Sequence, residues 1–119
     1  KKITKSVEII YGLRNFIGNA NKYSKSKIFI TLKSDRDITE IIIEDDGEGY
    51  PNEILSKIGE PYLQSYRNNN KEKSGLGLGI FIGKNLLEKN FANINCRYSK
   101  KKSGAKVVIT WQNKDLFKI

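Results

Sequence analysis

Two asparagines and a lysine–tyrosine pair share one side of the first helical pattern in the sequence. Asn15, Asn19, Lys22 and Tyr23 recur at helical spacing beside an apolar stripe. Asparagine is a mediocre helix former, and its amide oxygen is a suitable ligand for a hard divalent cation. The spacing therefore fits a cation site, although an asparagine-rich helix without any ligand explains these residues equally well.

An acidic segment, DDGEG at residues 45–49, follows directly after an apolar run at residues 41–43. A carboxylate at the end of a strand can accept a hydrogen bond from an exocyclic amine, and glycines allow the backbone to turn tightly beside a flat ring. A plain acidic turn and a calcium loop are the alternatives. The EF-hand pattern fails because the oxygen ligands stop after Glu48 and no glutamate stands at the twelfth position.

Glycines alternate with apolar residues in the segment GLGLG at residues 75–79, which we expect to open a helix. Free backbone N–H groups and the positive end of the helix dipole make such a start suitable for an anion, and the glycines allow a phosphate to approach. The segment is not a Walker A loop, because no Gly-Lys-Ser/Thr follows, and no strand leads straight into it as in dinucleotide-binding folds. A glycine-rich turn without a ligand is the other interpretation.

These three segments need elements to position them, and the hydrophobic pattern predicts a single α/β domain over residues 1–119. Residues 59–74 show no periodicity and are predicted to form a functional lid. The other expected elements are a helix at 3–23, strands at 27–32 and 40–44, helices at 51–58 and 76–90, and strands at 92–98 and 105–111. This order predicts a two-layer sandwich with helices on one face of a mixed, mostly antiparallel sheet.

The composition excludes several kinds of site. The chain has 119 residues, no histidine and one cysteine, so it contains no Ser-His-Asp triad, no histidine-ligated zinc and no phosphoryl-accepting histidine. We expect Cys96 to be a buried structural residue. The formal net charge is +9, but the lysines are spread along the chain apart from a predicted hairpin turn at residues 100–102, so we expect no specific nucleic-acid binding.

Together these segments resemble the catalytic ATP-binding domain of bacterial sensor histidine kinases, within the wider gyrase, Hsp90 and MutL type of ATP-binding fold. Residues 15–24 look like the N box, residues 45–49 like the G1 box, residues 59–62 (GEPY) like a variant F box and residues 75–79 like the G2 box. The resemblance covers essentially the whole chain and implies a Bergerat-type fold. It is greatest to the redox-responsive, Reg-type sensor kinases.

The resemblance implies a role for each matching residue. Asp45 would bind the adenine amino group, and Asn19 would hold a magnesium ion that bridges the phosphates. Lys22 would neutralise phosphate charge while Tyr23 packs beside the nucleotide. Asn15 stands where the hydrolysing relatives keep a glutamate, and an amide cannot act as a general base, so water would be poorly activated. Further ATP contacts are expected from Gly47, Gly49, Ile58, Gly59, Tyr62, Arg67, Gly75, Leu76, Gly77, Leu78 and Gly79.

The implied reaction needs an acceptor outside this chain. The γ-phosphoryl group of ATP, bound with Mg²⁺, would pass to a histidine on a separate dimerisation domain, and a response regulator would act downstream. The resemblance implies a domain that faces the bacterial cytoplasm. No apolar run approaches the roughly 20 residues of a membrane span, which leaves open an anchor in a longer parent protein.

A few residues depart from the family pattern and keep alternatives open. Gly18 replaces an acidic residue, Lys73 replaces a glycine, Tyr62 replaces a phenylalanine and Ala105 replaces a threonine, which leaves the lid geometry and the phosphate contact near residue 73 undetermined. Arg67 could reach the γ-phosphate or be a solvated lid residue. The alternative functions are a gyrase- or Hsp90-like ATPase, an anti-sigma-factor-type serine kinase, and polyanion binding without chemistry.

Overall fold

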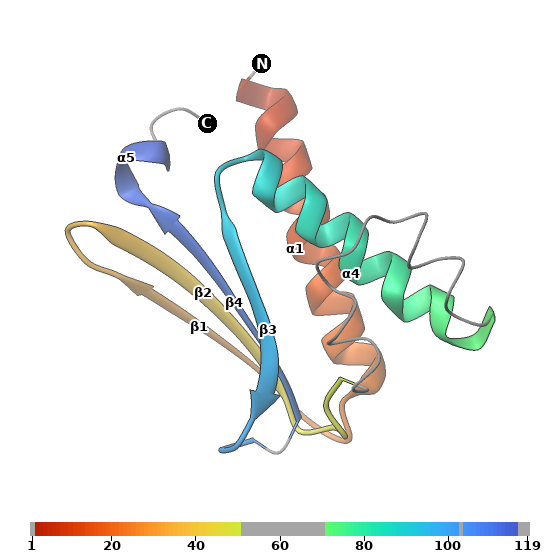
Figure 1. Ribbon diagram of the computed structural model, residues 1–119. Coiled ribbons are helices and arrows are strands. Elements are labelled where there is room, and N and C mark those ends of the chain that lie inside the picture. Colours follow the sequence, from red (N-terminus) through yellow and green to blue (C-terminus); the bar gives the residue numbers. More distant parts are fainter. Residues whose placement is uncertain (1, 51–70, 103, 117–119) are drawn as a thin grey trace.

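The computed structural model describes residues 2–50, 71–102 and 104–116, which form two layers (Figure 1). One layer is a four-stranded sheet in the order β1-β2-β4-β3, and all three of its strand pairs are antiparallel. Two long helices, α1 and α4, lie side by side on one face of this sheet. The elements are α1 (Lys2–Tyr23), β1 (Ile28–Ser34), β2 (Ile38–Asp45), α4 (Lys71–Lys89), β3 (Asn93–Ser99), β4 (Gly104–Gln112) and α5 (Asn113–Leu116).

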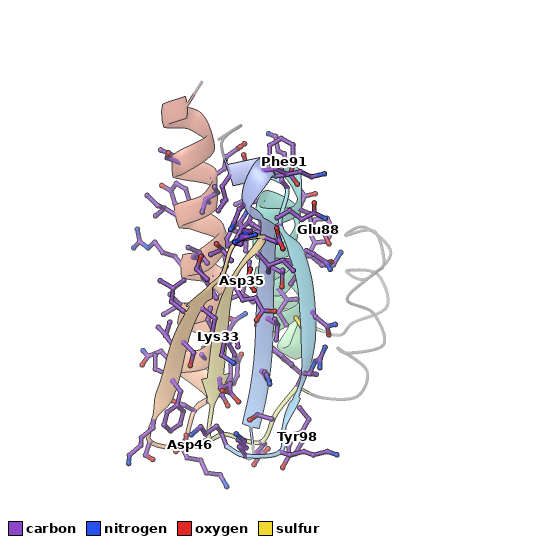
Figure 2. The ribbon with its side chains drawn as sticks, turned by 90° about the vertical axis from the view of Figure 1, so that its left-hand side faces the viewer. Lys33, Asp35, Asp46, Glu88, Phe91 and Tyr98 are labelled. Atoms are coloured by element: carbon purple, nitrogen blue, oxygen red, sulfur yellow. The ribbon has the colours of Figure 1, made fainter. Side chains whose placement is uncertain are left out.

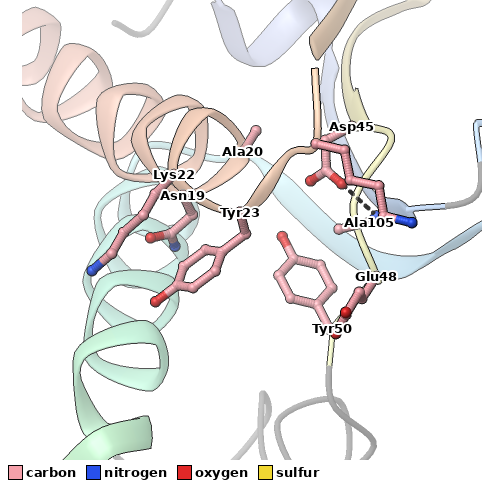
Figure 3. Close-up of a pocket in the computed structure, with 10 residues that line it drawn as sticks. Asn19, Ala20, Lys22, Tyr23, Asp45, Glu48, Tyr50 and Ala105 are labelled. Carbon is pink, nitrogen blue, oxygen red and sulfur yellow. Dashed lines mark hydrogen bonds between the residues drawn. The ribbon is translucent and has the colours of Figure 1, made fainter. Parts of the chain in front are cut away.

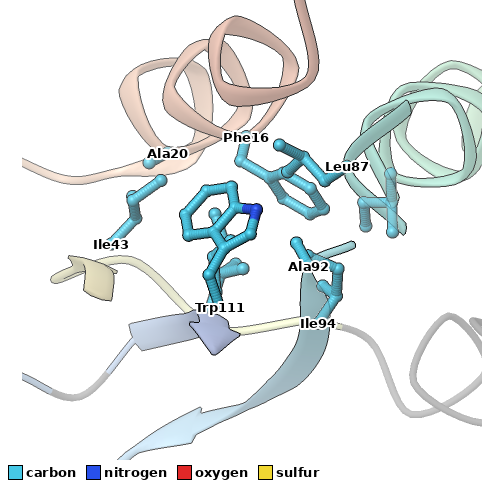
Figure 4. Packing of buried hydrophobic residues seen from close by; sticks show 10 residues of the cluster. Phe16, Ala20, Ile43, Leu87, Ala92, Ile94 and Trp111 are labelled. Atoms are coloured by element: carbon cyan, nitrogen blue, oxygen red, sulfur yellow. The ribbon is translucent and has the colours of Figure 1, made fainter. Parts of the chain in front are cut away.

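The hydrophobic core lies between the helix pair and the sheet (Figure 4). Phe16 of α1, Ile43 of β2, Leu87 of α4 and Trp111 of β4 are each at most 4% exposed. The indole N–H of Trp111 donates a hydrogen bond to the backbone oxygen of Asn90 at 3.1 Å, so the polar atom of this ring is satisfied inside the core. Every long element therefore contributes to one core.

The crossing of α1 and α4 depends on two glycines. A Cβ atom at Gly83 would lie 2.8 Å from Cε2 of Phe16, and one at Gly12 would lie 2.7 Å from Cγ of Leu87. These distances are shorter than real side chains allow, so only glycine lets the two helices approach this closely. The contact fixes α4 against the side of α1 that carries the asparagines.

The predicted order of elements is confirmed for the described residues, with differences at the ends and in one connection. Helix α4 begins at Lys71 rather than Leu76, so residues 71–74, predicted to belong to the lid, are helical. Lysine and glutamate are good helix formers, and this explains the extension. Helix α5 was not predicted, because four residues are too few to show a helical period. The helix predicted at 51–58 and the lid residues 59–70 lie outside the described residues.

The predicted two-layer fold with a mostly antiparallel sheet is confirmed, and the pairs that the four described strands form are all antiparallel. Among the described helices, none is both long and apolar enough to cross a membrane.

Candidate functional site

A cavity of about 430 Å³ opens between the C-terminal end of α1 and the end of β2 (Figure 3). This volume lies within the range of about 300–1,000 Å³ that is usual for small-molecule sites. Its walls come from the end of α1, the turn after β2 and the start of β4. The residues that line it are Asn19, Ala20, Lys22, Tyr23, Lys25, Asp45, Glu48, Gly49, Tyr50 and Ala105.

Asp45 is the buried carboxylate of this cavity, with 3% of its surface exposed. Its Oδ1 accepts hydrogen bonds from the backbone N–H of Gly47 at 2.9 Å and of Ala105 at 3.1 Å. Gly104 packs so closely that a Cβ atom there would collide with the backbone oxygen and Oδ1 of Asp45. None of the described residues donates a hydrogen bond to Oδ2. The fold therefore fixes the carboxylate through one oxygen and leaves the other for a ligand.

A second carboxylate, Asp46, ties the segment after α1 to the end of β2. It accepts hydrogen bonds at 2.6–3.2 Å from the backbone N–H groups of residues 25–27 and from the hydroxyl of Ser26. These hydrogen bonds, with that of the Ser26 hydroxyl the largest, hold the pKa of Asp46 well below its usual range. A Cβ atom at Gly47 would also collide with the backbone oxygen of Tyr23. The two segments are thus held together, which positions Tyr23 at the cavity.

Asn19 has an amide nitrogen that the fold does not use. Its Nδ2 is buried and has no hydrogen-bond partner in the part of the chain that the structure describes. Buried polar groups are costly to leave unpaired, and an unpaired one needs an explanation such as a ligand. A Cβ atom at Gly79 would lie 3.4 Å from this nitrogen and 3.7 Å from Oδ1 of Asn15. Both asparagines therefore face the glycine-rich segment of α4.

The amide nitrogen of Asn15, unlike that of Asn19, has a hydrogen-bond partner within the fold. Its Nδ2 donates a hydrogen bond to the backbone oxygen of Tyr11, one turn earlier in α1, at 2.9 Å. Asn15 is not among the residues that line the cavity. It lies one helical turn before Asn19 on α1, where α1 contacts Gly79 of α4.

The glycine-rich segment at residues 75–79 lies inside α4 and does not open it. Because α4 begins at Lys71, the backbone N–H groups of residues 75–79 fall within the i to i−4 hydrogen-bond pattern of the helix. The free N–H groups that we expected at these residues are therefore engaged in this conformation. Contacts of these residues with phosphate stay a prediction.

Tyr50 lines the cavity and was missed by the sequence analysis. Burial is the main cause that raises the pKa of its hydroxyl, and the neighbouring Cys96 and Asp45 act in the same direction. Burial also raises the pKa of Cys96 to about 12, which disfavours the reactive thiolate. Cys96 is partly buried against the core, rather than fully buried as predicted. The aromatic residue directly after the acidic, glycine-containing segment was the available signal for Tyr50.

The cavity brings together several of the predicted site residues, namely Asn19, Lys22, Tyr23, Asp45 and Gly49. Gly47 donates a hydrogen bond to Asp45, and Gly79 lies against both Asn19 and Asn15. Gly75, Leu76, Gly77 and Leu78 are part of α4, while Ile58, Gly59, Tyr62 and Arg67 lie outside the described residues. Besides Tyr50, the lining residues that the sequence analysis did not assign to the site are Ala20, Lys25, Glu48 and Ala105.

Comparison with known proteins identifies relatives that are much longer than this chain. Sensor histidine kinase RegB of Cereibacter sphaeroides is 39% identical over 98 residues, which cover 78% of this chain and 21% of RegB. Sensor histidine kinase CpxA of Escherichia coli is 31% identical over 78 residues, which cover 66% of this chain and 17% of CpxA. The chain therefore spans about a fifth of the length of these relatives. The match to RegB agrees with the expected resemblance to Reg-type kinases.

A solved structure and a family pattern agree with these relatives. The mycobacterial sensor histidine kinase MprB superimposes with a TM-score of 0.64 at 23% identity, covering 86% of this chain and 68% of the MprB chain, which supports the two-layer fold. The pattern of the histidine kinase-, DNA gyrase B- and HSP90-like ATPases matches residues 4–115. This range includes every residue that lines the cavity and nearly all of the fold, and the chain belongs to that family.

Proposed function

We propose that this domain binds ATP with Mg²⁺ and supplies the γ-phosphoryl group to a histidine on a separate dimerisation domain of a bacterial two-component system. The main observation behind the proposal is how the carboxylate of Asp45 is hydrogen-bonded. One carboxylate oxygen is fixed by two backbone N–H groups, and the other is left free at a cavity large enough for a purine nucleoside. A fixed acceptor of this kind suits the exocyclic amine of adenine.

The residues at the end of α1 suit the phosphates. Lys22 and Tyr23 line the cavity, and the Lys22 Nζ lies 5.4 Å from the centre of the Tyr23 ring. We expect this ammonium to neutralise phosphate charge and the aromatic ring to pack against the nucleotide. A lysine acts on phosphate as a mobile point charge, which fits its place at the open end of the site.

The amide of Asn19 fits a magnesium site. Because its nitrogen has no partner among the described residues, the side chain can turn to present its oxygen to a cation without giving up a hydrogen bond of the fold. When bound, Mg²⁺ would neutralise charge on the phosphates. Magnesium is commonly held by one or two protein oxygens together with the phosphates of its nucleotide.

Transfer to another protein is favoured over hydrolysis by Asn15. This side chain is an amide and donates its N–H to the backbone of its own helix, so it cannot remove a proton from water. A gyrase- or Hsp90-like ATPase needs such a base and is disfavoured. We propose that a histidine-bearing domain is the acceptor, that a response regulator acts downstream, and that the domain faces the bacterial cytoplasm.

Thermal unfolding with different nucleotides tests the binding step. Ligands that bind only the folded state raise its midpoint, so we expect ATP with Mg²⁺ to raise it most, ATP alone less, and GTP least. Equal shifts for ATP and GTP would contradict the adenine site.

Transfer is tested by mixing the domain with a histidine-containing dimerisation domain and ATP labelled at the γ-phosphate. Label that appears as free phosphate and never on the histidine would refute the transfer step.

A further inference from the structure

The face of the sheet opposite the helices carries a positively charged hollow of about 540 Å³. Figure 2 looks onto this face, with Lys33 of β1 labelled on it. Five of the six cations come from the β3–β4 hairpin, and Lys33 comes from β1 at the other edge of the sheet. They are Lys33, Arg97, Lys100, Lys101, Lys102 and Lys106, and Glu44 is the one carboxylate among the described lining residues. We call this surface the cationic hollow.

Strand register places like charges directly opposite each other in the cationic hollow. Lys106 of β4 pairs with Arg97 of β3, and on its other side with Glu44 of β2. Like charges in opposite positions of an antiparallel pair are destabilising. None of the six cations forms an ion pair with a described residue. Glu44 offsets only part of this positive charge, so the hollow keeps a net positive charge that an anionic partner would neutralise.

The turn between β3 and β4 is fixed over the hollow by specific contacts. The Ser99 hydroxyl donates a hydrogen bond to Oε2 of Glu44 at 2.6 Å, and the backbone N–H of Lys102 donates to Oγ of Ser99 at 3.1 Å. The Nζ of Lys102 lies 4.1 Å from the centre of the Phe29 ring, a cation–π distance. These contacts hold the turn, so little conformational entropy is lost when a partner binds.

From this arrangement we propose that the cationic hollow docks an acidic segment of a partner protein. Its floor includes Ile42, which is 9% exposed, and the half-buried ring of Phe29. An apolar centre with a charged rim is the anatomy of protein–protein contacts. Glu44 accepts a hydrogen bond from the hydroxyl of Ser99, and the lining stays cationic overall. A flat bilayer would not enter a hollow.

The test uses the whole chain and a synthetic peptide rich in aspartate and glutamate with one central leucine. Amide shifts in NMR spectra should change at residues of the hollow and leave Asn19, on α1 in the other layer, unaffected. Arg97→Gln should weaken peptide binding about two- to fivefold, as expected for one exposed ion pair. The same change should raise the thermal midpoint by about 1–4 °C, because it removes the repulsion with Lys106. Lys114→Gln on α5 is the matched control, since it removes the same charge from the opposite end of the sheet.

Several results would overturn the proposal. Equal weakening by Arg97→Gln and Lys114→Gln would mean that only net charge matters. Shifts that map outside the hollow, or no binding at low salt, would also refute it. Tighter binding of the chain to vesicles containing phosphatidylserine, or to duplex DNA, than to the peptide would assign the hollow to a membrane or to nucleic acid instead. Binding that Arg97→Gln weakens, and that 1 M salt abolishes through a Debye length of about 3 Å, would support it.

Discussion

Replacing Asp45 by asparagine should change which purine the cavity prefers. In the wild-type chain, Oδ1 is held by the backbone N–H groups of Gly47 and Ala105. An asparagine would keep its carbonyl oxygen at that place, because its NH₂ group would otherwise face two donors. The NH₂ group is then directed into the cavity, where it meets the amino group of adenine, donor against donor.

The size of the effect follows from the lost hydrogen bond. A hydrogen bond to a charged group contributes about 1–3 kcal/mol, so the Kd for an ATP analogue should rise about 5- to 150-fold. Inosine triphosphate carries a carbonyl oxygen in place of the amine, which can accept from the new NH₂ group. Its affinity should therefore fall less than that of ATP, or rise.

Titration calorimetry with a non-hydrolysable ATP analogue and inosine triphosphate measures both effects. Asp35→Asn is the matched control, because Asp35 also accepts backbone N–H groups, from Asp37 and Ile38 at 2.8 Å each, in the turn between β1 and β2. This control should leave both affinities unchanged. If Asp45→Asn weakened both nucleotides by the same factor, or neither, Asp45 would not be the group that recognises adenine.

Three other substitutions, with Gly18→Ala as the control for the first, test the residues around this carboxylate. Gly104→Ala should destabilise the fold by about 1–3 kcal/mol in urea unfolding, because its Cβ would collide with Asp45. Gly18→Ala should instead stabilise the fold by up to about 1 kcal/mol, because beyond the nearby backbone of its own helix no atom lies within 4 Å of the added Cβ. Asn19→Ala should remove the part of ATP affinity that depends on Mg²⁺, and equal loss with and without the metal would exclude Asn19 as its ligand. The lowered pKa of Asp46 means that its ionised form stabilises the fold above about pH 4 and that this stability is lost as the pH falls. Asp46→Asn should therefore make the stability measured by circular dichroism depend less on pH between about pH 5 and 2. An unchanged pH dependence in this range would contradict the role of Asp46.

The order of elements could be predicted because each long element carries a clear period. The β-branched runs of β2 and β4 place Ile43 and Ile109 in the core. On α1 the spacing predicted the helix but only part of its buried face, because Val7 and Ile10 of the predicted apolar stripe are 43% and 53% exposed, while Phe16, outside that stripe, is buried. The start of α4 could not be predicted, because its first residues, 71–74, are polar and give no amphipathic signal even though lysine and glutamate favour helix. A local pattern also cannot tell whether a glycine-rich segment begins a helix or lies within one.

The candidate site could be predicted in part, because the side-chain types of some of its residues already indicate what they can bind. Residue type and spacing singled out Asp45 and Asn19, and the resemblance to the family implied their roles. The role of Asp46 depends on residues about 20 positions earlier that come close only in the fold, and the grouping of Lys33 with Lys106 depends on strand order. Such contacts are set by tertiary structure, which one sequence read locally does not contain.

The place of Trp111 makes the chain its own reporter of folding. It is the single tryptophan, 4% exposed, and its ring is held by a hydrogen bond to Asn90. Ala105, at the proposed nucleotide cavity, lies six positions earlier on β4, about 20 Å away along an extended strand. The fluorescence of Trp111 should therefore change when the core unfolds and stay constant when a ligand binds in the cavity. This one signal would distinguish unfolding from ligand binding.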